Sequence, residues 1–224
     1  MNAATPPVGE RPVMSRGDRV ALGATAAVAA LVAVGAAVGG VMSVVQALRD
    51  DPLTLHGLPL VNARTPEFTE PVGQVSEAWY ESAALTVTGL PTAARWPFAA
   101  QSAVTALAVV GVSLALLWLA LRVLRNRPFG RSMTAALVAS AVLIIVGGTV
   151  SQLLGAAGNA AVVDHLGTDI TGGADTARPE GYEGLMTFAL DLSLAPVGVG
   201  LALAVVALAF QIGARLQRDT EGLV

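Results

Sequence analysis

The stretch Trp118-Leu-Ala-Leu-Arg-Val-Leu-Arg-Asn-Arg-Pro-Phe-Gly-Arg131 decides the fold of this chain, because it is a short basic connection between two long uncharged segments. Its four arginines fall within ten residues, at Arg122, Arg125, Arg127 and Arg131. Short loops rich in Arg are poorly translocated across membranes and therefore mark the cytoplasmic side. The stretch predicts a cytoplasmic hairpin between two membrane-spanning helices.

The composition on either side of this hairpin is that of a membrane protein. Of the 224 residues, 54% are hydrophobic and only 13% are charged, whereas a soluble domain carries about 25% charged residues. Four windows contain no charged residue, and each is longer than the roughly 20 residues with which a helix crosses a bilayer. The windows are 20–48, 97–121, 132–163 and 192–214. They predict an all-α integral membrane protein with four transmembrane helices.

The charges are distributed unevenly between the two sides of these windows. Nine of the 13 basic residues lie at the N-terminus, in the hairpin or at the C-terminus, and twelve of the 16 acidic residues lie within 50–96 and 164–191. The positive-inside rule then places both termini and the hairpin in the cytoplasm, which requires an even number of crossings. We expect a multi-pass protein of the inner (plasma) membrane with the lipid bilayer as its first partner. The net charge of −3 averages a basic and an acidic face and therefore says nothing about nucleic acid. We expect no direct binding of nucleic acid.

These signals divide the chain into nine segments. A signal peptide would have an apolar region of about 7–15 residues, so the longer first window predicts a retained helix, in which Gly35 and Gly39 form a small-xxx-small pair suited to close helix contact. Pro97 suits the first position of the second helix, and Trp96 and Trp118 suit its two interfaces. We expect a cytoplasmic tail over 1–18, helices over 19–49, 97–121, 132–157 and 192–212, an extracytoplasmic segment over 50–96, the basic hairpin over 122–131, an extracytoplasmic loop over 158–191, and a cytoplasmic tail over 213–224.

Two short stretches of the first extracytoplasmic segment predict β-strands. Residues 53–56 and 84–88 alternate apolar and polar residues, and each is followed by Gly-Leu-Pro. Alternation with Gly and Pro punctuation is typical of short strands. In such a strand Leu85 and Val87 share one face, and Thr86 and Thr88 share the other. We therefore expect a small extracytoplasmic cap that contains some strand.

The sequence offers little that could carry chemistry. There is no Cys, and the two histidines, His56 and His165, could join Asp164, Asp169 or Glu67 in a metal site, although solvated loop histidines are the favoured interpretation. No Gly-x-Ser-x-Gly or phosphate-binding Gly loop is present, and the windows hold no ionisable residue of the kind that transporters use. We expect no catalytic residue, no cofactor and no metal. Polar residues within the windows could line a vestibule, but bonds within or between helices are favoured; they include Gln46, Gln101, Ser102, Thr105, Ser113, Ser140, Thr149, Ser151 and Gln152.

The two cytoplasmic segments together resemble the domain-of-unknown-function 2975 family, small bacterial four-helix membrane proteins. The resemblance rests on the basic stretch followed by Pro128-Phe129 and a long apolar helix, and on Phe210-x-x-Gly213-x-x-Leu216-x-x-Asp219 near the C-terminus. Members often carry further Arg and Asn residues after Pro-Phe, whereas residues 132–136 of this chain are nearly apolar. The resemblance implies no catalytic activity, and it suggests a helix-turn-helix regulator as a cytoplasmic partner.

We therefore expect a non-enzymatic regulatory or scaffold membrane protein that couples the cap or the bilayer to a cytoplasmic partner. The alternative is a small transporter or exporter subunit for an apolar substrate, and self-association stays open. Topology and headgroup attraction, about 1 kcal/mol for each Arg, account for much of the arginine cluster, and docking of a protein is the competing interpretation. The candidate contact surface comprises Arg122, Arg125, Arg127, Pro128, Phe129, Arg131, Phe210, Gly213, Leu216 and Asp219.

Overall fold

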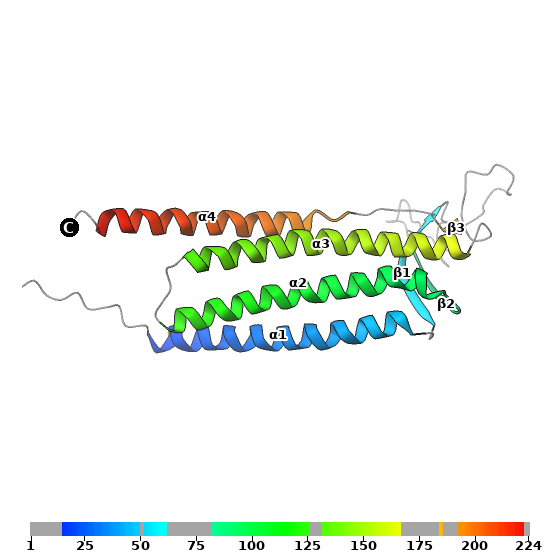
Figure 1. Ribbon diagram of the computed structural model, residues 1–224, viewed down its shortest axis with the longest axis horizontal. Coiled ribbons are helices and arrows are strands. Elements are labelled where there is room, and N and C mark those ends of the chain that lie inside the picture. The colour runs from blue at the N-terminus through cyan, green and yellow to red at the C-terminus, as the bar shows by residue number, and fades with distance from the viewer. Residues whose placement is uncertain are drawn as a thin grey trace, which may run out of the picture.

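Four long helices and a small sheet make up the computed structural model, which describes residues 15–49, 52–61, 82–125, 131–166, 184–185 and 192–221 (Figure 1). In chain order the elements are α1 (Arg16–Leu48), β1 (Leu53–Val61), β2 (Ser82–Val87), α2 (Thr92–Leu124), α3 (Arg131–Leu166), β3 (Gly184–Leu185) and α4 (Ala195–Glu221). All four helices are long and apolar enough to cross a membrane. This confirms the prediction of a mostly helical chain with four candidate spans.

The apolar side chains of these helices lie largely on the surface. Leu31 of α1 is 73% exposed, Leu107 of α2 is 70% exposed, and Leu201 of α4 is 56% exposed. Soluble monomers rarely expose large contiguous apolar surfaces, whereas the acyl chains of a bilayer cover such surfaces. The exposure therefore agrees with a multi-pass membrane protein.

The helices form an open row. Every extensive contact between described helices joins neighbours in the sequence, so that α1 packs on α2, α2 on α3, and α3 on α4. Arg16, where α1 begins, and Glu221, where α4 ends, lie at the same end of the row as the end of α2 and the start of α3 (Figure 1). We call this the hairpin end, and we call the opposite end, where the strands lie, the sheet end.

Small residues bring α3 close to both of its neighbours. A Cβ added to Gly147 would lie 2.6 Å from Cβ of Ala108 in α2, and one added to Gly148 would lie 2.5 Å from Cβ of Pro196 in α4. Adjacent glycines thus serve opposite sides of α3, which is how a helix in the middle of a row contacts two partners closely.

The close contact of α1 involves a different glycine from the two that the sequence suggested. A Cβ on Gly40 would overlap Ala106 of α2, whereas nothing lies within 4 Å of a Cβ built on Gly35 or Gly39. The small-xxx-small pair therefore does not mediate the α1–α2 contact. Its face of α1 is open.

Several helix boundaries differ from the expected ones. The second helix begins at Thr92, so Pro97 lies inside it, and the prediction that Pro97 occupies the first helical position is wrong. Pro97 has no N–H to donate to the carbonyl four residues earlier. The loss of this one hydrogen bond is tolerated because it falls near the start of the helix. The third helix continues past 157 to Leu166. The fourth runs from Ala195 to Glu221 and therefore includes most of the stretch 213–224 that was expected to be a tail.

The first helix begins at Arg16 because Ser15 caps it. The Ser15 hydroxyl accepts a bond from the Asp18 N–H at 3.1 Å, and the Asp18 carboxylate accepts one from the Ser15 N–H at 3.3 Å. This reciprocal pair is a capping box, which satisfies two otherwise unpaired backbone donors.

The predicted strands are present and pair in an antiparallel ladder at the sheet end. The strand order is β2-β1-β3, and the Thr54 and Thr86 hydroxyls lie 3.2 Å apart across the first two strands. Val87 is buried and Thr86 is exposed, which confirms the expected division of faces.

Both Gly-Leu-Pro sequences have the same role in the structure. Gly57 and Gly89 have φ values of 72° and 74°, a left-handed conformation that costs glycine little. The leucine after each glycine, Leu58 or Leu90, is buried. These side chains join a hydrophobic cluster that also includes Leu55, Val87, Ala94, Val162 and Val163. The cluster packs the sheet against the start of α2 and the end of α3.

Candidate functional site

The hairpin end contains the described part of the candidate contact surface. The guanidinium carbon of Arg122, in the last turn of α2, lies 5.0 Å from the ring centroid of Trp118, within the range of a cation–π interaction. This contact orients one arginine along the helix surface. Arg125 is the C-cap that follows α2; it is exposed, and its N–H donates to the Leu121 carbonyl. Arg125 is thus available to a partner at this end.

The remaining hairpin residues are described only in part. Arg131 is the first residue of α3, and Arg127, Pro128 and Phe129 lie outside the described residues. The prediction that Phe129 anchors a contact stays a prediction.

The C-terminal residues of the candidate surface all lie on α4. Phe210 is 43% exposed, Gly213 borders open space, and Leu216 and Asp219 belong to the same helix. Successive residues of a helix are rotated by roughly 100°, so Phe210 and Asp219 start from opposite sides of α4. A partner that contacts both must reach around the end of this helix.

Arg95 is a buried charged residue that the sequence reasoning did not single out. It lies in the first turn of α2, is 1% exposed, and donates from Nε to the Leu90 carbonyl at 3.1 Å. The expected helix start at 97 left Arg95 in the extracytoplasmic segment over 50–96. Pro91 was the available signal, because it precedes the true helix start and places Arg95 within the first turn. Arg95 ties this turn to the segment that follows β2.

Gln152 of α3 fixes the start of α4. Its Oε1 accepts a hydrogen bond from the Ser193 N–H at 2.6 Å, and its Nε2 donates to the Ser193 carbonyl at 3.3 Å and to the Gly148 carbonyl at 3.1 Å. Thr105 and Ser140 donate to backbone carbonyls of their own helices. For these three residues the prediction of bonds within or between helices is confirmed.

The residues considered for a metal site are only partly described. His165 and Asp164 are exposed at the end of α3, and His56 lies in β1. Glu67 and Asp169 fall outside the described residues. Within the described ranges, no three His, Cys, Asp or Glu residues come together in a way that could hold a metal ion.

No protein-family model, curated protein or solved structure matches this chain. The resemblance to the domain-of-unknown-function 2975 family therefore stays a prediction.

Proposed function

We propose that this chain is a non-enzymatic regulatory or scaffold protein of the inner membrane, with both termini in the cytoplasm. It communicates the state of its extracytoplasmic sheet end to a cytoplasmic protein bound at the hairpin end. The arginine asymmetry supports this orientation, because α1 begins and α4 ends at the same end as the basic connection.

The observation that carries the proposal is the continuity of α2 and α3 between the two ends. Val162 and Val163 of α3 are buried in the cluster beneath the sheet, and the same helix begins at Arg131. Ala94 of α2 belongs to that cluster, and the same helix ends beside Arg125. A helix shift of about 1–2 Å is the scale on which allosteric transitions operate. A displacement of the sheet would therefore move the hairpin along with both helices.

The chemistry of the hairpin end favours a partner with an acidic surface. Four arginines lie within residues 122–131, and two more follow at Arg215 and Arg218. Arg binds carboxylates with two parallel hydrogen bonds. The family resemblance suggests a helix-turn-helix regulator in this role.

The first experiment asks whether the hairpin arginines dock a protein. Because other arginines also favour a cytoplasmic location, Arg125→Gln/Arg127→Gln/Phe129→Ala should leave topology unchanged and should reduce recovery of a specific crosslinked partner at matched expression. Recovery of the same proteins from variant and parent would reduce the arginines to topological signals.

The second experiment asks whether the sheet end controls that docking. Leu58 is 1% exposed in the cluster, so Leu58→Ala should loosen the sheet by about 2–5 kcal/mol. Leu194→Ala removes the same atoms from a side chain that is 74% exposed and serves as the control. Hydrogen exchange of β2 verifies the loosening, and partner recovery should change for Leu58→Ala only. Unchanged recovery with a loosened sheet would refute the coupling.

A further inference from the structure

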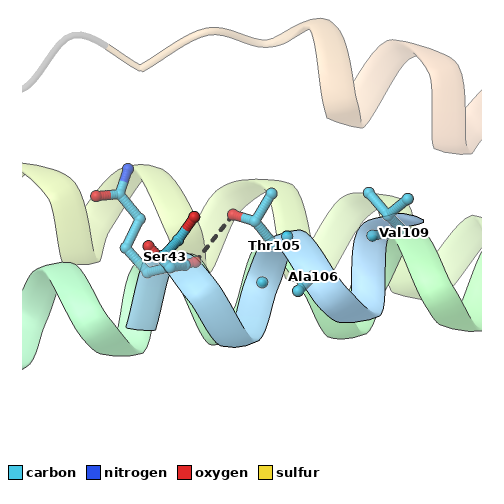
Figure 2. Close-up of a pocket in the computed structure, with 9 residues that line it drawn as sticks. Ser43, Thr105, Ala106 and Val109 are labelled. Atoms are coloured by element: carbon cyan, nitrogen blue, oxygen red, sulfur yellow. Dashed lines mark hydrogen bonds between the residues drawn. The ribbon is translucent and has the colours of Figure 1, made fainter. Parts of the chain in front are cut away.

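A groove of about 440 Å³ lies between α1 and α2, within the range of sites that bind small molecules. Gly39 and Ser43 line it from α1, and Gln101, Ser102, Thr105 and Val109 line it from α2. Ser43 lies toward one end of the groove, Val109 lies toward the other, and Thr105 lies between them (Figure 2). The groove is therefore polar towards the sheet end and apolar towards the hairpin end.

Two exposed tryptophans indicate the depth of this groove in a bilayer. Trp96 and Trp118 are about 33 Å apart along α2 at 1.5 Å per residue, which matches a hydrocarbon core of about 30 Å. Both side chains are exposed, as interfacial aromatic residues are. Along α2, Gln101 lies about 8 Å from Trp96 towards Trp118, and Val109 lies about 20 Å from Trp96 in the same direction. The polar end thus falls just beneath the headgroups, and the apolar end falls near the midplane.

Three polar side chains of the groove lack a hydrogen-bond partner among the described residues. They are the Gln101 amide and the Ser43 and Ser102 hydroxyls, whereas the Thr105 hydroxyl donates to the Gln101 carbonyl at 2.9 Å. Hydrocarbon offers no hydrogen bonds, so an unsatisfied polar group there is costly. All three groups can donate. The groove therefore suits a molecule that brings an acceptor to this depth.

Glycines shape this polar end. A Cβ on Gly155 of α3 would lie 2.9 Å from Nε2 of Gln101, so the lack of a side chain at Gly155 leaves room for the Gln101 amide beside α3. Nothing lies within 4 Å of a Cβ built on Gly39, so this part of the groove wall is free.

We propose that the groove binds one acyl chain of an ester-linked glycerophospholipid from the leaflet at the sheet end. The ester carbonyl accepts hydrogen bonds from Gln101 and one of the two serines, because a carbonyl oxygen has two lone pairs, and the chain extends past Gly39 towards Val109. The ester carbonyl supplies the missing acceptor at the required depth, and the hydrocarbon that follows it matches the apolar end. The proposal depends on insertion in a bilayer and not on a cytoplasmic partner.

The test is photolabelling of the full-length protein in lipid vesicles. The probe is a phosphatidylethanolamine with a diazirine in one ester-linked acyl chain, and mass spectrometry locates the label. We expect labelling concentrated in residues 36–43 and 101–109. An ether-linked probe of equal chain length lacks the carbonyl acceptor and should label these segments about eightfold less, the equivalent of two hydrogen bonds within a membrane protein.

Two leucine substitutions on α1 separate groove binding from general lipid contact. Gly39→Leu fills the groove and should remove most of the label. Gly35→Leu lies about one turn away, where an added Cβ also meets open space and where the residue does not line the groove, so it should keep the label. Gln101→Leu keeps the approximate volume, removes the donor and should reduce labelling about threefold.

Three results would overturn the proposal. The first is equal labelling of Gly39→Leu and Gly35→Leu, or label spread evenly over the exposed helix faces, because either means ordinary boundary lipid only. The second is fast modification of Ser43→Cys by a membrane-impermeant thiol reagent, which means a water-filled vestibule. The chain has no cysteine of its own, so this reaction reports one site. The third result, which decides the matter if Gly39→Leu does not fold, is labelling of Gln101→Leu equal to that of the parent.

Discussion

The contact between Gly147 of α3 and Ala108 of α2 provides a quantitative test of the helix row. A methyl group on Gly147 would lie 2.6 Å from Cβ of Ala108, whereas carbon atoms in contact prefer about 3.5–4.0 Å. Gly147→Ala therefore forces the two helices apart by about 1 Å, the shortfall from that contact distance. The separation also loosens the contact in which Gly158 of α3 faces Phe98 of α2.

Two effects of opposite sign determine the size of the change in stability. Overpacking of a well-packed contact costs about 1–3 kcal/mol, and replacing Gly by Ala within a helix contributes about 0.5–1 kcal/mol in the other direction. The steric effect is larger, so Gly147→Ala should lower the free energy of unfolding. Gly35→Ala makes the same chemical change where nothing lies within 4 Å, and it should leave that free energy unchanged or raise it slightly.

A double-mutant cycle distinguishes this contact from a general loss of stability. Gly147→Ala/Ala108→Gly moves the methyl group to the other helix, so it should recover most of the loss, with a coupling energy of about 1–3 kcal/mol. Reversible unfolding in mixed detergent micelles, followed by helical circular dichroism, measures all four proteins. Additive effects in the cycle, or equal effects of Gly147→Ala and Gly35→Ala, would refute the placement of α3 against α2.

Three further predictions address other parts of the chain. Topology reporters fused at Pro128 should report the cytoplasm and those at Gly173 the outside, and a cytoplasmic signal at Gly173 would contradict four crossings. Gln152→Leu removes both bonds to Ser193 and should lower the stability of the start of α4 by about 0.6–1.7 kcal/mol for each bond. Amide exchange there should become faster, and unchanged exchange would show that these bonds do not hold the segment. Arg95→Met leaves the Leu90 carbonyl without its Nε donor and should destabilise the sheet end by about 1–3 kcal/mol. Amide exchange in β2 should then be faster than in the parent, and equal exchange in variant and parent would contradict this role of Arg95.

The strands at the sheet end could be predicted because their signal is local. Alternation of apolar and polar residues depends only on the period of a strand, and burial of Val87 with exposure of Thr86 follows from it. The contribution of the two Gly-Leu-Pro sequences to one cluster could not be predicted in this way. It depends on bringing Leu58 and Leu90, from opposite sides of a long connection, over Val162.

The candidate contact surface was predictable in location and not in geometry. The charge pattern places its residues at one end of the chain, and α2, α3 and α4 do bring their described members to the hairpin end (Figure 1). The helical rotation between Phe210 and Asp219 places them on different sides of α4, which the linear motif does not reveal. Arg95 was missed because its burial depends on where α2 begins, and Thr92 rather than Pro97 is that position.

The sequence by itself determined the number and approximate extent of the four helices, because the cost of placing charge in a bilayer leaves long uncharged windows. Only the tertiary structure decided which face of each helix meets a neighbour. Apolar residues surround α1, α2 and α3 almost evenly, since lipid and protein interior are equally apolar and hydrophobicity drives no face inward. Close packing made that choice instead, through Gly40 rather than Gly39, and through Gly147 towards α2 and Gly148 towards α4.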